Sequence, residues 1–204
     1  HRLIRRQRQM CIRDRLYLAR HGETEENVAQ ILQGHLPGHL TERGRNQAVQ
    51  LRNTLMQSGA SFDALLTSDL QRTIDTTQIV NEAFHLQPML CPLLRERDWG
   101  SLTGHTIAEA HQVSLPADAE TVEQLFERAR QFLEYVSQTF PNQHVLCIGH
   151  GLFCRCIIAA NAGCLISDVP RMQNAEVRSI IVACKANTSP SPSAPNNDPL
   201  ISAN

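Results

Sequence analysis

Two apolar runs that lead into a histidine constrain the fold of this chain more than any other feature of its sequence. Residues 16–19 lead through one arginine into His21, and residues 145–149 lead directly into His150. Runs this short and this apolar, with glycine beside each histidine, are typical of buried strands. The sequence therefore predicts that each histidine lies just beyond the end of a strand.

Helical patterns separate the predicted strands along the chain. The clearest spans residues 120–139, where apolar side chains recur at i, i+3, i+4 and i+7. Another begins with Thr41 as N-cap and places Leu51, Leu55 and Met56 on its buried face. The remaining elements are expected as helices after Ser68 or Asp69 and over residues 152–161, and as strands over residues 62–67, 87–94 and 177–184.

This alternation of strands and helices predicts an α/β fold with a largely parallel sheet. Pro88 and Pro92 cannot donate ladder hydrogen bonds, so residues 87–94 are expected at an edge of that sheet. Ligands of such sheets bind beyond the carboxyl ends of the strands. The fold thus offers a way to bring His21 and His150 together at one site.

The composition indicates one globular domain with reduced cysteines. A chain of 204 residues, 42% of them hydrophobic, can bury a sizeable core. The seven cysteines are an odd number and lie mostly in apolar runs, which predicts free thiols and a cytoplasmic location. Cys154 and Cys156 stand close to His150, but no second ligand pair has the spacing of a zinc site, so we expect them to pack in the core. No apolar run is long enough to span a bilayer.

The two ends of the chain differ from its body. Residues 1–15 carry six arginines and one acid; without them 13 bases face 19 acids, a formal charge of −6 that disfavours nucleic acid as a partner. Residues 10–14 resemble the translation of a transposon adapter used in sequencing libraries, so we expect residues 1–15 to be a non-native extension. Residues 185–204 are rich in Asn, Ser, Pro and Ala and are predicted to be a disordered tail. The domain itself is expected over residues 16–184.

A series of motifs follows the first predicted strand in a fixed order. They are Arg-His-Gly-Glu-Thr at residues 20–24, Leu-Thr-Glu-Arg-Gly at 40–44, Ser-Asp-Leu-Gln-Arg-Thr at 68–73, Arg-Glu-Arg-Asp-Trp-Gly at 95–100 and Gly-His-Gly at 149–151. Together with Asn174, they resemble the histidine phosphatase superfamily in its phosphoglycerate mutase-like branch. The resemblance implies a three-layer α/β/α sandwich. The cap over the site is expected to be small, because only 45 residues separate Gly104 from His150.

The resemblance also implies a chemical role for each motif. His21 is expected to attack phosphorus and form a phosphohistidine, and Glu96 to protonate the leaving oxygen and then act as base toward water. His150 is the third catalytic residue and, if protonated, would add a positive donor. Arginine suits the binding of phosphate because its guanidinium is always charged and donates paired hydrogen bonds. The expected substrate-binding residues are Arg20, Asn27, Gln33, Arg72 and Gly151.

One stretch departs from the pattern of many relatives. Residues 33–41 read Gln-Gly-His-Leu-Pro-Gly-His-Leu-Thr, and residues 37–39 stand where many relatives carry an acid and a proline. Thr103 likewise stands where many relatives carry a glutamate. The border of the pocket is therefore expected to differ, and His35 and His39 could touch the substrate.

The sequence thus predicts a phosphomonoester hydrolase that acts on a small phosphorylated metabolite and needs neither a metal nor an organic cofactor. A phosphoglycerate mutase would use the same His21, but it must exclude water from its intermediate, and the short cap argues against that. A phosphatase for phosphohistidine or phosphoproteins would suit a shallow site. A non-catalytic phosphate-binding protein would lack a core residue, and all are present. The loops at residues 33–39 and 101–118 are expected to set the substrate, while the oligomeric state stays open.

Overall fold

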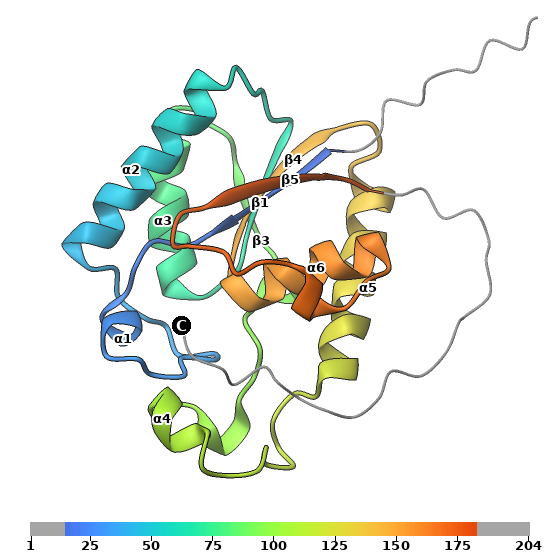
Figure 1. The fold of residues 1–204 in the computed structure, drawn as a ribbon. Coiled ribbons are helices and arrows are strands. Elements are labelled where there is room, and N and C mark those ends of the chain that lie inside the picture. The colour runs from blue at the N-terminus through green and yellow to red at the C-terminus, as the bar shows by residue number, and fades with distance from the viewer. Residues whose placement is uncertain (1–14, 183–204) are drawn as a thin grey trace, which may run out of the picture.

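The computed structural model describes residues 15–182, whose five strands form a single sheet (Figure 1). The sheet order is β3-β2-β4-β1-β5, and only β5 runs antiparallel to its neighbour. This confirms a largely parallel sheet with the segment after residue 87 at its edge. The predicted N-terminal extension, apart from Arg15, and the predicted tail lie outside the described residues. The strands are β1 (Arg15–Arg20), β2 (Ala64–Thr67), β3 (Pro88–Leu90), β4 (His144–Gly149) and β5 (Val177–Ile181).

Helices cover both faces of the sheet, which confirms the three-layer α/β/α sandwich. In Figure 1, α2 and α3 lie on one side of the strands and α5 and α6 on the other. Each face has its own apolar cluster, with Leu51, Leu65 and Ile148 in one and Leu66, Phe132 and Phe153 in the other. The helices are α1 (Glu25–Val28), α2 (Glu42–Gln57), α3 (Gln71–Asn81), α4 (Ile107–Ala110), α5 (Val122–Thr139) and α6 (Gly151–Ala162).

The long helices begin where the sequence supplies a cap. Thr41 accepts a hydrogen bond from the Gly44 N–H at 2.9 Å, as expected for α2. Thr121 and Gln124 form a reciprocal capping box at the start of α5. The buried stripe of α5 includes Phe132, which is 0% exposed; its truncation to alanine is expected to cost about 3–5 kcal/mol of stability.

Three local predictions were wrong, each for a physical reason. α3 is capped by Leu70 without a side-chain hydrogen bond, because both predicted caps bond elsewhere, Ser68 to a histidine of the site and Asp69 to Arg95. The predicted strand 87–94 ends at Leu90, and Pro92 starts the 3₁₀ helix η1 (Pro92–Leu94). Met56 is 54% exposed rather than buried, because the apolar stripe of α2 passes through its neighbour Leu55.

A small cap follows η1 and covers the carboxyl end of the sheet. We define the cap as residues 100–119, which contain the 3₁₀ helix η2 (Gly100–Leu102) and α4. Its apolar cluster joins Leu102 and Ile107 to Trp99, and an isolated bridge pairs Ile31 with Thr106. Figure 1 shows α4 away from the sheet, at the same end of the molecule as α1. The expected small cap is therefore present.

Candidate active site

The two predicted histidines lie side by side beyond neighbouring parallel strands. β1 and β4 pair so that Arg20 stands opposite Gly149, and the His21 N–H donates to the Gly149 carbonyl at 3.0 Å. The ring centroids of His21 and His150 are 5.3 Å apart, and the two residues are 3% and 0% exposed. Residues far apart in sequence thus meet at one edge, as the parallel sheet predicts.

His21 is held in the tautomer that a nucleophile requires. Its Nδ1 lies 2.6 Å from the Gly22 carbonyl oxygen, which can only accept, so Nδ1 carries the proton. Burial, together with the nearby guanidinium groups of Arg72 and Arg20, holds the pKa of His21 well below its usual range. The ring is therefore neutral at physiological pH, with its lone pair on Nε2.

His150 is neutral as well, so it does not add the positive donor that a protonated His150 would supply. Arg72 Nε can only donate, so His150 Nδ1 accepts its hydrogen at 3.2 Å, and His150 Nε2 donates to Ser68 Oγ at 3.0 Å. Burial, with Arg72 as the nearest charge, holds the pKa of His150 well below its usual range. His150 acts here as a support for Arg72 rather than as a third cation.

Arg72 is bound by the loop at residues 33–41, the stretch that departs from the pattern of many relatives. Its guanidinium donates to the carbonyl oxygens of Leu36 and Gly34, the latter at 2.9 Å. Gly38 allows this close wrap: its φ is +69°, and a Cβ there would lie 3.0 Å from Arg72 Cδ. Burial lowers the pKa of Arg72 to about 10, so the group stays charged near neutral pH. Residues 34–38 thus fix a buried cation beside His21.

Arg20 supplies a second cation, and its Nε–H donor is available to a ligand. Its Nη1 donates to the Met172 carbonyl at 2.7 Å, whereas its buried Nε has no hydrogen-bond partner among residues 15–182. A Cβ on Gly151 would lie 3.1 Å from this Nε, so glycine lets the guanidinium lie across the start of α6. The positive end of that helix dipole points at the same place.

Three amide side chains line the cavity beside these arginines. Asn27 Oδ1 accepts from the Thr24 N–H and from Asn174 Nδ2, both at 3.2 Å, which leaves the Asn27 amino group for a ligand. The second donor bond of Asn174 Nδ2 goes to the His21 carbonyl at 3.3 Å. Gln33 is 7% exposed, and its Oε1 has no hydrogen-bond partner in the described part of the chain.

Glu96 reaches the site from the edge strand, by way of η1. Its Oε2 accepts from the Leu152 N–H, in the first turn of α6, at 3.3 Å. Its Oε1 accepts from the Arg97 N–H at 2.9 Å. Two backbone donors therefore orient the Glu96 carboxylate, which lines the same cavity as His21.

A cavity of about 310 Å³ unites these residues. Every predicted site residue lines it except His150, which lies behind Arg72. The two loop histidines do not line it either: His35 Nε2 donates to the Glu96 carbonyl at 3.0 Å, and His39 pairs with Glu26 at 3.9 Å. The predicted lining residues are Arg20, His21, Asn27, Gln33, Arg72, Glu96 and Gly151.

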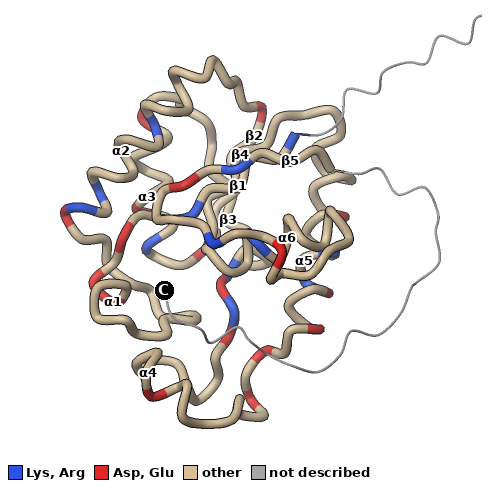
Figure 2. The backbone as a smooth tube through the Cα atoms, viewed as in Figure 1, with Lys and Arg blue, Asp and Glu red and all other residues tan. Residues whose placement is uncertain are grey.

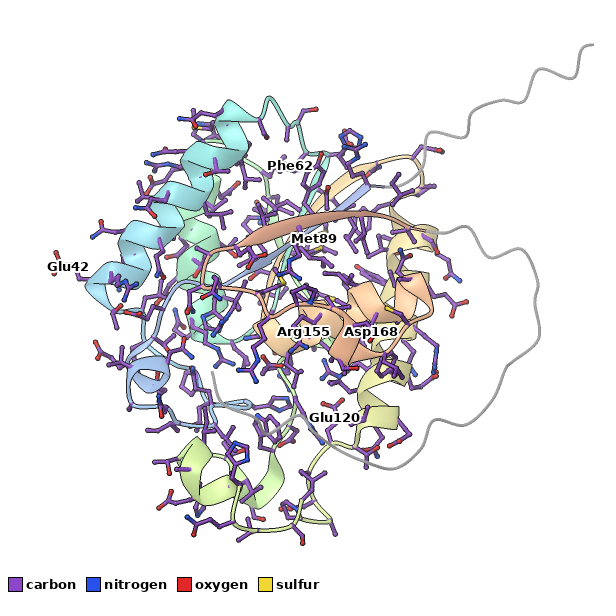
Figure 3. All side chains as sticks on the ribbon, in the orientation of Figure 1. Glu42, Phe62, Met89, Glu120, Arg155 and Asp168 are labelled. Carbon is purple, nitrogen blue, oxygen red and sulfur yellow. The ribbon has the colours of Figure 1, made fainter. Side chains whose placement is uncertain are left out.

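The outer part of the cavity holds residues that the sequence analysis missed. We call Trp99, Ile107, Arg155 and Arg171 the rim of the cavity, and all four line it. Arg155 lies on α6 (Figure 3), and it is the one charged residue of that helix, a signal that could have revealed it. In Figure 2, several arginine positions lie in the space between the helices α3 and α6. The rim thus carries two arginines, in addition to Arg20 and Arg72.

The described residues also bear on metal binding, thiol reactivity and membrane insertion. Residues 15–182 contain no group of three or more side chains that could hold a metal ion. Cys154 and Cys156 lie in the core as predicted, and burial raises the pKa of each thiol to about 12. No helix within the same range has the length and apolar character needed to cross a membrane.

Comparisons with known proteins agree with this geometry. The model of the histidine phosphatase superfamily (branch 1) matches residues 16–190. The uncharacterized phosphatase PhoE of Bacillus subtilis is 30% identical over 173 residues, 83% of this chain and 85% of that protein. The probable phosphoglycerate mutase GpmB of Cronobacter sakazakii is 30% identical over 162 residues, 72% of this chain and 74% of that protein. The structure of Bacillus stearothermophilus YhfR superposes with a TM-score of 0.76 at 26% identity, covering 86% of this chain and 98% of that one.

Proposed function

The chain belongs to the histidine phosphatase superfamily, and from this premise we propose that it hydrolyses phosphomonoesters through a phosphohistidine at His21. One observation carries the proposal: a neutral histidine with its lone pair on Nε2 lines a cavity together with the buried Arg72 and the half-buried Arg20. A neutral imidazole is a nucleophile, and the guanidinium groups of Arg20 and Arg72 match the charge of a phosphoryl group.

The reaction proceeds in two steps at the same atoms. In the first, His21 Nε2 bonds to phosphorus, the bond from phosphorus to the ester oxygen breaks, and the proton of the Glu96 carboxyl group goes to that oxygen. In the second, a water oxygen bonds to phosphorus while the Glu96 carboxylate takes its proton, and the bond to Nε2 breaks. The enzyme returns to its starting state and releases inorganic phosphate.

Stabilisation of charge supplies much of the catalysis in this proposal. The phosphoryl oxygens would lie between Arg20 and Arg72, with the Gly151 N–H and the Asn27 amino group as neutral donors. Groups fixed in advance and shielded from water stabilise a transition state without reorganising. Their bonds to backbone carbonyls fix both arginines in this way. We therefore expect activity without metal or organic cofactor.

Hydrolysis is favoured over mutase activity by the size of the cap. A mutase must keep water from its phosphoenzyme while the intermediate turns over, which calls for an enclosing lid. The cap of this chain has one helix of four residues, α4, and η2. Similarity does not decide the matter, because a phosphatase and a probable mutase match equally at 30% identity.

A small, anionic substrate fits the cavity best. Its volume of about 310 Å³ lies at the low end of the range for small-molecule sites and suits a metabolite rather than a protein surface. Arg155 and Arg171 add positive charge beyond the phosphate end. Together they favour leaving groups that carry a carboxylate or a second phosphate. A cytoplasmic location stays a prediction.

One experiment tests the function. The protein is incubated in EDTA with p-nitrophenyl phosphate and with 3-phosphoglycerate, beside His21→Asn and a surface control, His111→Asn. We expect release of phosphate from both compounds by wild type and the control, and none by His21→Asn. An acid-labile phosphoenzyme should be trapped only where His21 is present. Isomerisation of 3-phosphoglycerate that outpaces its hydrolysis would instead establish the mutase.

A further inference from the structure

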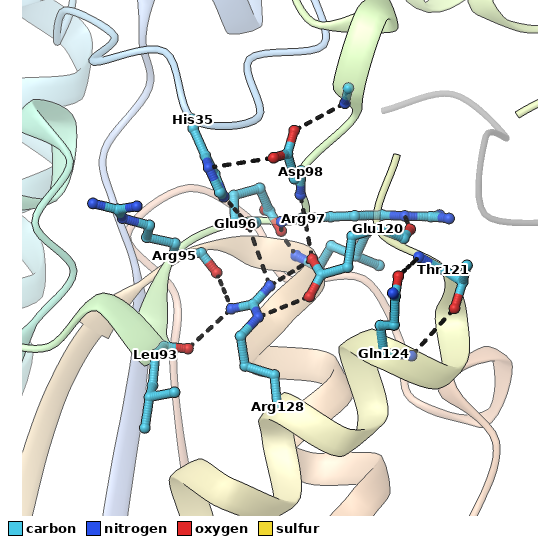
Figure 4. Close-up of polar contacts among 12 residues, drawn as sticks. His35, Leu93, Arg95, Glu96, Arg97, Asp98, Glu120, Thr121, Gln124 and Arg128 are labelled. Carbon is cyan, nitrogen blue, oxygen red and sulfur yellow. Dashed lines mark hydrogen bonds and ion pairs between the residues drawn. The ribbon is translucent and has the colours of Figure 1, made fainter. Parts of the chain in front are cut away.

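An ion pair at the start of α5 lies outside the cavity but holds the segment that carries Glu96 (Figure 4). Arg128 Nε donates to Glu120 Oε1 at 2.8 Å, and Arg128 Nη2 donates to Glu120 Oε2 at 2.7 Å. This paired arrangement is the strongest that arginine and a carboxylate form. The side chains are only 17% and 13% exposed, so solvent screens the pair weakly.

The other hydrogens of Arg128 go to backbone carbonyls of the segment that leads to Glu96 and to the carbonyl of Glu96 itself. Nη1 donates to the carbonyls of Leu93 and Arg95 at 2.9 and 2.7 Å, and Nη2 reaches the Glu96 carbonyl at 3.3 Å. After η1 ends at Leu94, this segment belongs to no helix or strand until η2. Arg128 therefore supplies donors that regular structure would otherwise provide.

Glu120 holds the residues that follow. Its Oε2 accepts from the Asp98 N–H at 3.3 Å, and its own N–H donates to the Asp98 carbonyl at 2.8 Å. Its carbonyl accepts from Arg97 Nε at 2.8 Å. Figure 3 shows Glu120 where the chain passes from the cap into α5. The pair thus ties residues 93–98 to the first turns of α5.

The guanidinium of Arg128 also packs against α6, the helix that follows His150. It lies 3.9 Å over the ring of Phe153, which is 0% exposed in α6. The preceding residue, Leu152, donates its N–H to Glu96 Oε2. Arg128 therefore bonds to the backbone of Glu96 and packs against Phe153, the residue after the one that anchors the Glu96 carboxylate.

We propose that Arg128 and Glu120 are positioning residues for Glu96: their ion pair fixes the backbone of residues 93–98 so that the Glu96 carboxyl group meets the leaving oxygen. The proposal rests on the phosphatase function proposed above. Neither residue touches the substrate. Their effect passes through the geometry of proton transfer, in which an error of about 1 Å can cost on the order of 100-fold in rate.

Proton transfer gives the proposal a specific signature. An alkyl phosphate leaves a strongly basic alkoxide and depends on the acid, whereas p-nitrophenyl phosphate leaves a stable phenolate and depends on it little. General acid catalysis contributes roughly 10²–10⁴-fold. Loss of Glu96 positioning should therefore lower kcat/KM on glycerol phosphate much more than on p-nitrophenyl phosphate. A general loss of structure would lower both by the same factor.

The experiment compares kcat/KM on these two substrates for wild type, Arg128→Met and Glu120→Gln, with Glu96→Gln as the reference for a missing acid. We expect the ratio of the two values to shift against glycerol phosphate by about tenfold or more in both α5 variants, in the direction set by Glu96→Gln. Arg128→Lys, which retains charge but not the paired geometry, tests the same point if Arg128→Met fails to fold.

The same helix offers matched controls. Arg130 and Glu127 form an ion pair whose side chains are 57% and 58% exposed, so Arg130→Met and Glu127→Gln repeat the chemistry at the surface of α5. They should leave the substrate ratio unchanged. An unchanged ratio in folded Arg128 and Glu120 variants would overturn the positioning role. Absence of His21-dependent hydrolysis in wild type would instead overturn the phosphatase function itself.

Discussion

The phosphate end and the rim of the same cavity are built by different means. We use phosphate end for Arg20, His21, Arg72 and His150, which stand at strand ends or in the first turn of α3. Both histidines and Arg72 are at most 3% exposed, and the ring or guanidinium of each bonds to the protein. The rim instead combines Arg155 of α6 and Arg171, before β5, with Trp99 and with Ile107 of the cap.

This difference separates the reaction from the choice of substrate. Groups at the phosphate end are shielded from water, so their charges act strongly and tolerate little displacement. Rim arginines are partly solvated, so each contributes modestly and can vary without loss of the fold. We therefore expect substitutions at the phosphate end to lower activity on every substrate, and substitutions at the rim to alter preference among substrates.

The largest contrast is expected between one methyl group added next to His21 and one added to the cap. A Cβ on Gly22 would lie 2.3 Å from the Gly44 carbonyl oxygen, whereas a Cβ on Gly104 of the cap meets nothing within 4 Å. Gly22→Ala must displace the backbone next to His21, and we expect a loss of more than about 100-fold in kcat/KM. Gly104→Ala carries only the strain of its φ of +90°, about 1 kcal/mol of stability. Kinetics with p-nitrophenyl phosphate and urea unfolding measure both; equal activity of the two variants would contradict the contrast.

Two arginines that differ in burial should give the next largest effect. Arg72→Lys keeps the charge but lacks the planar fork whose separate nitrogens donate to His150 and Gly34, so we expect kcat to fall about 10- to 100-fold. Arg95 pairs with Asp69, and its side chain is 40% exposed. Arg95→Lys should therefore change kcat less than about twofold, as for ordinary surface pairs. Steady-state kinetics compare the variants, and a loss in Arg95→Lys as large as that in Arg72→Lys would remove burial as the explanation.

The same division explains what the sequence predicted well. His21 and His150 were placed together because a buried apolar run leaves little choice but a strand, and parallel strands bring their carboxyl ends to one edge. Each of the four parallel strands leads to a group of the site: β1 to His21, β4 to His150, β2 to Ser68 and β3, through η1, to Glu96. Apolar runs in the sequence were sufficient to place a residue wherever that residue follows the end of a strand.

Contacts from side chain to backbone were not predictable, because they leave no pattern of residue types. Ser68 was read as a helix cap, a common role for serine, since nothing marks that its hydroxyl bonds to His150. Arg128 was one polar residue on an amphipathic helix, and its acceptors are carbonyl groups, which every residue carries. The fold and the meeting of His21 and His150 at one edge of the sheet thus followed from sequence, whereas the contacts that support Glu96 and the rim residues did not.

At the rim, a substitution should change substrate preference by a smaller factor. Arg171→Gln removes a cation that lines the outer cavity but leaves the phosphate end intact. We expect KM for 3-phosphoglycerate to rise about two- to fivefold, the range of a solvated ion pair, with kcat unchanged. KM for glycerol phosphate, whose leaving group is uncharged, should stay constant. Arg130→Gln on the outer face of α5 is the control, and an equal rise in KM for both substrates would exclude a role in selecting anionic leaving groups.

The pH dependence of stability bears on the phosphate end alone. Burial holds the pKa of His150 well below the ordinary value of 6.5, so below pH 6.5 the unfolded chain takes up a proton that the native protein does not. Its contribution is fully present above pH 6.5 and is lost as the pH falls below that value. Between pH 7.5 and 5.5 this loss amounts to about 1.4 kcal/mol per histidine. Urea unfolding of His150→Asn should therefore show a pH dependence weaker by that amount than wild type, with His111→Asn on the surface of the cap as its matched control. If His150→Asn and wild type lose stability in parallel, His150 is not held neutral, and the lone pair that receives the Arg72 hydrogen is not available in the native protein.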